Sequence, residues 1–313
     1  MLVRFWGVRG SLPAPLHPCD IKEKVSTILQ KALPEDLADD ESRQRFLAGL
    51  PPWLYGTVGG NSPCVSITID GFNEPIVFDC GSGLREMGVA CLNKDPTPLQ
   101  YHIFFSHFHW DHLMGFPFFN PAYNASVTLD LYSPKLELEE VLMGQMNNPY
   151  FPVKMENMPA KKNFHQLRGP VSIGPATISF RELNHPGRSF SYLLCHNGKR
   201  FIYATDTELG ASDFAQTEEN ASFFKDADVI VLDSQYTVGE AISKYNWGHS
   251  AFSMSVDFAA NWGIKRLVLF HHDPSYDDRK LHGMVQSARW YLERMNIKGL
   301  QVSLATEELE ISL

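Results

Sequence analysis

The chain has 313 residues, of which 44% are hydrophobic and 20% are charged, a composition that excludes disordered and fibrous classes. The net charge of −9, with no basic block, argues against electrostatic capture of a nucleic-acid backbone. The five cysteines include no C-x-x-C pair, which fits a reduced, cytoplasmic protein better than a secreted disulfide scaffold. No apolar run approaches the ~20 residues of a membrane span, and the first residues lack a signal-peptide pattern, so we expect no membrane partner.

Ten short runs of β-branched and aromatic residues, each bounded by turn residues, predict strands along the chain. They are Leu2–Trp6, Cys64–Ile69, Ile76–Asp79, His102–Phe105, Val127–Tyr132, Ala176–Phe180, Ser191–Cys195, Arg200–Tyr203, Val229–Leu232 and Leu267–Phe270. Four stretches between them predict helices, namely Ser82–Leu92, Pro134–Met146, Ser250–Trp262 and Asp277–Met295. Strands in two groups with interspersed helices favour two sheets that pack together under helices, over one doubly wound parallel sheet.

Two segments are expected to decorate a single domain that covers residues 1–313. Residues 20–50 carry apolar side chains near helical spacing, among them Ile21, Val25 and Leu29, and predict a helical insertion. Residues 136–158 are rich in Met, Asn and Pro. They predict either a surface helix and loop filled by adaptable methionines or a cap over a site.

Twelve histidines are many for an acidic protein, and three of them lie close together directly after a predicted strand. His107 and His109 are two residues apart, so in an extended segment their side chains point the same way. Asp111 and His112 follow where the chain would turn into a helix. Four nitrogen or oxygen ligands so close together can serve two metals, and imidazole with carboxylate suits zinc, manganese or iron. A structural site would more typically be closed by cysteines, and none lies nearby.

The pattern H-x-H-x-D-H after a strand resembles the signature of the metallo-β-lactamase-fold hydrolases. The resemblance extends over nearly the whole chain and implies an α/β (α+β) protein with four αββα layers, two facing mixed sheets and outer helices. It also implies that Asp79, at a strand end, orients the metal-binding loop. Two divalent ions are implied, zinc first, with manganese or iron as alternatives. The first would be held by His107, His109, His185 and Asp206, and the second by Asp111, His112, Asp206 and His271.

His272 stands beside His271 and is the alternative ligand at that position. Adjacent residues that leave a strand point to opposite faces, so only one of the two is expected to bind, and the strand-end position favours His271. A water that bridges two divalent ions is deprotonated near neutral pH and becomes the nucleophile. The chain therefore needs no Ser or Cys nucleophile, and none is evident.

Asp233 ends a predicted buried strand, and His249 precedes a predicted helix. This pair resembles the acidic residue and the histidine of the phosphodiesterase branch of the fold, which includes tRNase Z. There the carboxylate orients an imidazole that protonates the leaving alkoxide. Asp111, His249 and Asp233 are therefore the catalytic candidates. The structural alternative is a helix-capping histidine with a structural aspartate.

The chain also resembles small bacterial phosphodiesterase-like members, in Phe5–Ser11, Gly59–Asn61 and His271–Pro274. Their relatives include enzymes that act on cyclic nucleotides and cyclic phosphates. Only 20 residues separate His185 from Asp206, too few for the long arm of tRNA-processing relatives. We therefore expect a small phosphodiester as substrate and no long nucleic acid. The candidate pocket residues are Arg9 for phosphate, Asn61, and the aromatic Tyr245 and Trp247 for stacking a base.

Three other functions stay open. The first is a hydrolase of a carbonyl substrate such as a thioester, lactone or β-lactam, for which His249→Ala is expected to leave the rate nearly unchanged. The second is a tRNA 3′-end endonuclease, and the third is a ligand sensor that kept the fold without catalysis. The sequence does not decide between a monomer and a homodimer.

Overall fold

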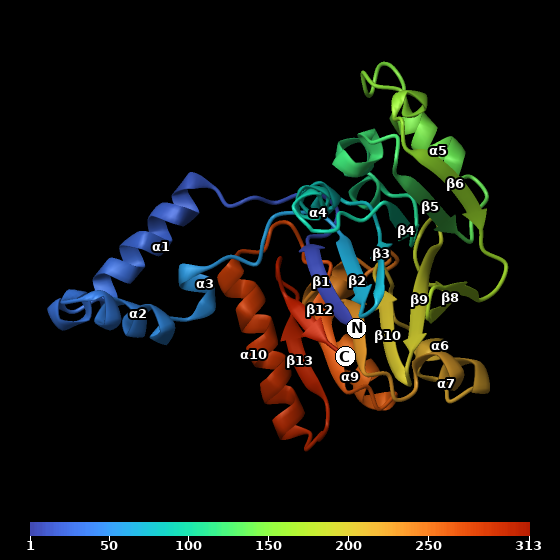
Figure 1. Cartoon of the computed structure of the whole chain (residues 1–313). Helices are drawn as coiled ribbons and strands as arrows, with labels where there is room; N and C mark the ends of the chain where they lie inside the picture. Colours follow the sequence, from blue (N-terminus) through green and yellow to red (C-terminus); the bar gives the residue numbers. More distant parts are fainter.

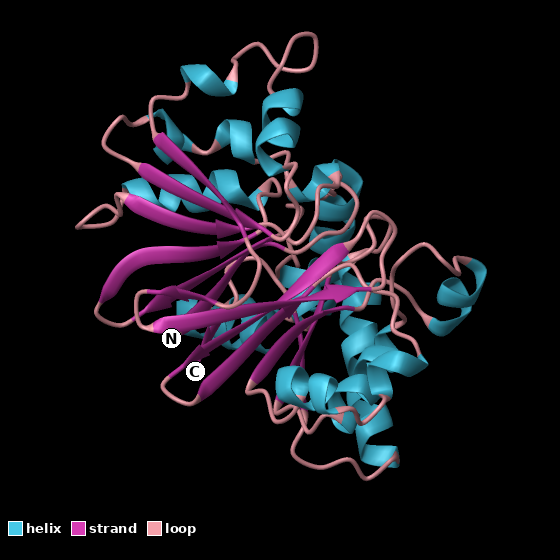
Figure 2. Cartoon of the chain, turned by 90° about the vertical axis from the view of Figure 1, so that its right-hand side faces the viewer, coloured by secondary structure: helices cyan, strands magenta, loops and turns pink.

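The strands form two seven-stranded sheets that face each other in a computed structural model of residues 1–313 (Figures 1 and 2). The first sheet has the order β14 (Glu310–Ser312), β1 (Leu2–Gly7), β2 (Cys64–Ile69), β3 (Phe72–Phe78), β4 (Gln100–Phe104), β5 (Thr128–Ser133) and β6 (Lys161–Gln166). The second has the order β13 (Gln301–Leu304), β12 (Arg266–Phe270), β11 (Val229–Asp233), β10 (Lys199–Ala204), β9 (Ser189–His196), β8 (Ala176–Leu183) and β7 (Val171–Ile173).

Helices cover the outer faces of both sheets (Figure 2). The longer helices outside the N-terminal insertion are α4 (Gly83–Leu92), α5 (Leu138–Gln145), α9 (Phe252–Asn261) and α10 (Asp278–Arg294). The short helices α3 (Pro52–Tyr55), α6 (Ala211–Phe214), α7 (Glu218–Phe224) and α8 (Val238–Ser243) lie in the connections between the longer elements. None of the helices is both long enough and apolar enough to cross a bilayer. The four-layer αββα arrangement that the resemblance implied is confirmed.

Successive side chains along the strands of the first sheet point to opposite faces and fill two separate core regions. Phe78 and Phe104 point between the sheets and join the larger core, in which Phe78 packs on Tyr203 of β10. Their neighbours Val77 and Ile103 point outward and belong to the smaller core under the outer helices. This period of two makes each of these strands apolar on both faces, as expected for strands buried in a sheet covered by helices.

All ten predicted strands and all four predicted helices coincide with elements of the structure. The four strands that the sequence did not predict, β6, β7, β13 and β14, are the edge strands of the two sheets. Each exposes part of its length, so it lacks the apolar run that marks a buried strand.

The segment 20–50 contains α1 (Pro18–Lys31), a 3-10 turn (Pro34–Leu37) and α2 (Asp40–Gly49), which project from the sheets (Figure 1). Neither α1 nor α2 has a buried residue. Lys24 attaches the segment to the body because its ammonium pairs with the carboxylate of Asp278 and donates to the Gly56 carbonyl at 2.7 Å. We infer a single domain that carries this segment as an insertion.

The segment 136–158 packs against the outer face of the first sheet. Met146, Met155 and Met158 are buried in the smaller core together with Leu142. No residue of the segment lines the pocket at the candidate site. This packing favours methionines that fill gaps in the core over a cap.

A hydrogen-bonded carboxylate fixes α8, which leads into the loop before His249. Glu240 accepts from the backbone N–H of Thr237 at 3.0 Å, from the hydroxyl of Tyr276 and from the ammonium of Lys280 at 2.9 Å. Burial alone would raise the pKa of Glu240, but the hydrogen bonds outweigh it and lower this pKa to about 2.

Glu240→Gln is expected to destabilise the fold in a pH-dependent way. The pKa in the folded protein lies below the ordinary value of 4.5, so the carboxylate stabilises the fold above that pH and loses this contribution as the pH falls toward about 2. The difference in the free energy of unfolding between wild type and variant, measured by urea denaturation, should be largest at neutral pH and shrink below pH 4.5. A difference independent of pH would contradict the expectation.

Candidate metal centre

The candidate site lies where strands of both sheets end. In the first sheet, β3 and β4 lead into Asp79 and into the loop that holds His107. In the second sheet, the parallel strands β10, β11 and β12 lead into Asp206, Asp233 and His271. Because the carboxyl ends of parallel strands meet at one edge of a sheet, residues far apart in the sequence converge there.

Two groups of four side chains with metal-binding atoms form at this edge, beside a smaller group of Asp233, His249 and His271. Within each group, one ligand atom from every residue lies within 4.8 Å of the others. The two groups of four are His107, His109, His185 and Asp206, and Asp111, His112, Asp206 and His271. Asp206 belongs to both, so the structure brings together the two ligand sets that the sequence analysis expected.

The chemistry of these groups fits divalent cations. The Nε2 atoms of His107 and His112 are buried and have no hydrogen-bond partner, which is costly unless another group satisfies them. Burial lowers the pKa of His107 well below its usual value, which favours the neutral imidazole that binds metals. For His112, burial acts in the same direction, but Asp111 and Asp206 raise its pKa well above the usual value. The same two carboxylates would favour a bound cation.

Three residues of the site have an unusual backbone conformation. Asp79, Asp206 and His271 have φ of 61°, 47° and 61°, in the left-handed region that few non-glycine residues adopt. Each follows a strand end, where the turn redirects its side chain into the site. Such conformations persist only when the surrounding structure enforces them, and they are concentrated at functional sites.

Asp79 holds the loop of the H-x-H-x-D-H motif in place. The carboxylate is fully buried and accepts from the backbone N–H and the hydroxyl of Ser106, both at 2.7 Å, and from the hydroxyl of Tyr203 at 2.8 Å. It also pairs with Nδ1 of His112 at 2.8 Å. This contact turns Nε2 of His112 toward the metal-binding group, as residues behind metal ligands commonly do.

Asp79→Asn is expected to weaken metal binding by roughly 10- to 100-fold. The carboxylate has two oxygens that accept hydrogen bonds from Ser106, Tyr203 and His112, whereas the amide would keep only one accepting oxygen. Competition with a chromophoric chelator would measure this change. Asp130→Asn is the matched control, because Asp130 is also a buried carboxylate with several hydrogen bonds but lies within β5 and does not line the pocket. Equal affinity of the Asp79 variant and this control would contradict the role of Asp79.

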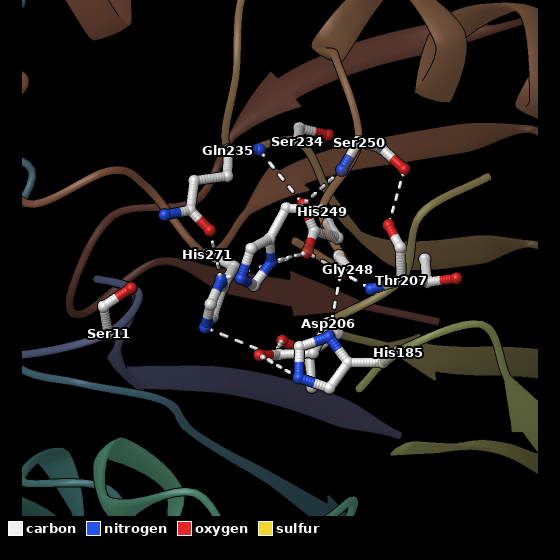
Figure 3. Close-up of polar contacts among 12 residues, drawn as sticks. Ser11, His185, Asp206, Thr207, Ser234, Gln235, Gly248, His249, Ser250 and His271 are labelled. Carbon is white, nitrogen blue, oxygen red and sulfur yellow. Dashed lines mark hydrogen bonds and ion pairs between the residues drawn. The ribbon is translucent and has the colours of Figure 1, made fainter. Parts of the chain in front are cut away.

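His249, of the predicted pair Asp233 and His249, lies beside His185 and His271 of the metal-binding groups (Figure 3). Oδ2 of the fully buried Asp233 is 2.7 Å from Nδ1 of His249, and its Oδ1 accepts from the backbone N–H of Ser250 at 3.2 Å. The imidazole of His249 stacks on that of His271 with 5.0 Å between ring centroids. Burial alone would lower the pKa of His249, but Asp233 outweighs it and raises this pKa to about 9.

Gly248 attaches the loop of His249 to the first metal-binding group. Its carbonyl accepts from Nδ1 of His185 at 2.9 Å, which leaves Nε2 of His185 directed at the group. Gly248 has φ of 85°, and a Cβ atom there would lie 2.2 Å from Nδ1 of His185. A glycine is therefore required for this close approach.

A pocket of about 400 Å³ opens over both groups. Besides expected site residues, it is lined by Ser11, Phe108 and Trp110, which the sequence analysis did not single out. Phe108 and Trp110 lie between the ligands of the motif, and this position in the sequence could have indicated that they line the pocket. Ser11 carried no such signal: its backbone N–H donates to Oδ2 of Asp111 at 2.8 Å, 100 residues away.

The structure corrects two predicted pocket residues, Arg9 and Asn61. The guanidinium of Arg9 is buried and donates to the carbonyls of Gly59 at 2.8 Å and Tyr276 at 2.7 Å, so it has no free donor side toward the pocket. The amide of Asn61 donates to the carboxylate of Glu307 at 3.2 Å. Both side chains stabilise loops beneath the site, and neither lines the pocket.

Tyr245 and Trp247, the other two predicted pocket residues, do not line this pocket either. They are 72% and 61% exposed, and the ammonium of Lys244 lies over the ring of Trp247 at 5.9 Å. The alternative ligand His272 is directed away from the metal-binding groups, with Nε2 donating to the carbonyl of Ala305 at 2.9 Å. His271 is the member of the adjacent pair that faces the site.

Two facing mixed sheets with His/Asp groups at one edge define a metal-dependent hydrolase of the metallo-β-lactamase fold. The chain belongs to the family described as "Beta-lactamase superfamily domain", which matches residues 75–272. The predicted family resemblance, fold class and enzyme class are thereby confirmed.

Known proteins similar to the chain include one curated relative and two solved structures. The chain is 25% identical over 276 residues to a Ribonuclease Z of Streptococcus equi subsp. zooepidemicus (strain H70), covering 73% of this chain and 89% of the relative. It is similar in fold to a diphosphatase from the PhnP family, with a TM-score of 0.62, 16% identity and coverage of 100% and 97%. Zn(2+)-bound PqqB from Methylobacterium extorquens gives a TM-score of 0.66, 13% identity and coverage of 100% of both chains.

Proposed function

We propose that the chain hydrolyses a small phosphodiester, such as a cyclic nucleotide or a cyclic phosphate. The observation that carries this proposal is the hydrogen bond between the buried carboxylate of Asp233 and Nδ1 of His249, 2.7 Å long, at the wall of the pocket. A phosphodiester releases an alkoxide, which needs a proton, whereas a thioester releases a thiolate that needs none at neutral pH. A positioned imidazole is therefore of most use to the first kind of substrate.

We further propose that the two groups hold two divalent ions. His107, His109, His185 and Asp206 would hold the first, and Asp111, His112, Asp206 and His271 the second. When bound, the ions would lower the pKa of water and neutralise charge on the phosphate oxygens. Zinc is supported by the His/Asp ligand set and by the Zn(2+)-bound PqqB of similar fold. Manganese and iron are the alternatives with the same ligands.

His249 would supply the proton. Because Nδ1 is engaged by Asp233, the second nitrogen, Nε2, is the one available to the pocket. Asp233 favours the protonated ring and fixes its orientation, and three backbone N–H groups, from Thr207, Gln235 and Ser250, hold Asp233 in turn. The proton would pass from Nε2 of His249 to the leaving oxygen of the substrate.

The distribution of basic side chains supports a small substrate. No Lys or Arg lines the pocket. In the loops around it, the ammonium of Lys244 pairs with Asp273 at 3.3 Å and the guanidinium of Arg188 pairs with Glu182 at 2.7 Å. A long polyanion needs several unpaired basic groups along its backbone, whereas a single phosphodiester needs charge neutralisation only at the reacting phosphate.

A tRNA 3′-end endonuclease is the second candidate, favoured by the curated relative named Ribonuclease Z. It shares the proposed proton donor and metal-binding residues, so only the substrate separates the two. Its weakness is that no Lys or Arg lines the pocket and that Lys135 is the basic group beside it, with its ammonium over the ring of Phe108.

A substrate survey with the metal-loaded protein tests the proposal. The panel should contain 2′,3′- and 3′,5′-cyclic nucleotides, a base-free cyclic phosphate, precursor tRNA, a thioester, a lactone and a β-lactam. We expect turnover of small phosphodiesters. Cleavage of precursor tRNA alone would support the second candidate, and turnover of carbonyl substrates alone would overturn both. Full metal occupancy without any turnover would favour a sensor.

A further inference from the structure

Trp110 is the one tryptophan of the chain without a partner inside the protein. Its side chain is 80% exposed, although it lies in the middle of the metal-binding motif and lines the pocket. The chain has six tryptophans, and the other five all pack on a cation or on aromatic rings. Trp6 packs on Arg4, Trp53 on Arg279, Trp247 on Lys244, Trp290 on Arg294, and Trp262 on Phe224 and Phe258.

The backbone of Trp110 is fixed by the motif around it. Its carbonyl accepts from the N–H groups of Leu113 at 3.0 Å and Met114 at 2.8 Å, which closes the short 3-10 turn Trp110–His112. The flanking residues His109 and Asp111 belong to the two metal-binding groups. The backbone of the motif therefore places the indole at the pocket wall.

The pocket lacks other means of holding the organic part of a substrate. Its polar lining consists of Ser11 and the histidines and aspartates of the site, and its only other aromatic residue is Phe108. One face of the Phe108 ring is covered by the ammonium of Lys135, 4.8 Å from the ring centroid. The indole of Trp110 is thus the large apolar surface that a substrate can cover.

We propose that Trp110 is the platform on which the base of a nucleoside phosphodiester stacks, which makes nucleotides the substrate class. The inference rests on the proposed hydrolysis of a small phosphodiester and adds the group that the site recognises. Stacking on an aromatic side chain is strong and tolerates every base, because each base has a π-face. It needs no cation in the pocket, in keeping with the absence of Lys and Arg from the lining.

A matched pair of ligands tests the platform without relying on turnover. Adenosine 5′-monophosphate and ribose 5-phosphate carry the same phosphate and sugar, and only the first has a base. Calorimetric titration of the metal-loaded protein should show tighter binding of adenosine 5′-monophosphate. Trp110→Ala should weaken binding of this nucleotide by roughly tenfold and leave binding of ribose 5-phosphate unchanged, whereas Trp110→Phe should recover part of the loss.

The control is Trp290→Ala, because Trp290 is 58% exposed on α10 and does not line the pocket. Both substitutions remove an exposed indole, so neither is expected to disturb folding. Equal affinity of the wild type for the two ligands, or equal weakening of both by Trp110→Ala, would overturn the platform. The expected binding pattern without hydrolysis of any phosphodiester would instead overturn the proposed function and support the platform.

Discussion

Replacing His249 by Ala is expected to lower kcat for a cyclic nucleotide by roughly a hundredfold or more. The reason is that the leaving alkoxide would lose its proton donor, the imidazole that Asp233 orients from 2.7 Å. The loss should be much smaller for a p-nitrophenyl phosphodiester, since p-nitrophenolate leaves without a proton. Comparing kcat for the two leaving groups in wild type and variant measures this difference.

His196→Ala serves as the control, because His196 is a half-buried histidine that donates to the carbonyl of Pro175 and does not line the pocket. Metal content should stay at the wild-type level in the His249 variant, since His249 belongs to neither of the two four-residue metal-binding groups. An equal loss for both leaving groups would show that His249 acts through the metal centre or the fold. An unchanged rate with the cyclic nucleotide would show that His249 does not protonate its leaving group.

Asp206→Asn is expected to lower the metal content below that of the wild type and to reduce activity by roughly a thousandfold or more, since metal ions supply several kcal/mol of charge stabilisation. Its Oδ1 atom lies 3.2 Å from Nε2 of both His112 and His271, and its Oδ2 atom lies 3.5 Å from Nε2 of His107. This one carboxylate thus serves both metal-binding groups. Removing its charge is therefore expected to weaken the binding of both ions. Elemental analysis of the purified protein gives the metal content per chain.

Asp111→Asn is the informative partner of that variant, because Asp111 belongs only to the second group. It should lose one ion and retain the other. Asp228→Asn is the control, because it also removes a carboxylate. Asp228 precedes β11, at the end opposite the metal-binding groups, and pairs there with Lys265 at 2.8 Å. Full metal content and activity in the Asp206 variant would contradict its place between the two groups.

The sequence by itself determined most of the candidate metal centre and the central strands. Metal ligands are recognisable by residue type and spacing, and His107, His109, Asp111 and His112 lie in one short loop where spacing controls geometry. Asp206, Asp233 and His271 were expected from the resemblance to the metallo-β-lactamase-fold hydrolases, and each lies at the end of an apolar strand. The edge strands were not predicted, since an exposed edge needs no apolar run.

Only the tertiary structure decided which side chains form the pocket wall. Arg9 was expected to bind phosphate, but its guanidinium donates to the carbonyls of Gly59 and Tyr276, which are distant in the chain. Exposed aromatic residues near His249 suggested a stacking surface there, whereas the structure places Trp110 at the pocket. The physical reason is that the partner of a polar group and the exposure of an aromatic ring depend on segments packed from elsewhere. Length, composition and net charge limit the class of protein to which the chain can belong, but they contain no information on those contacts.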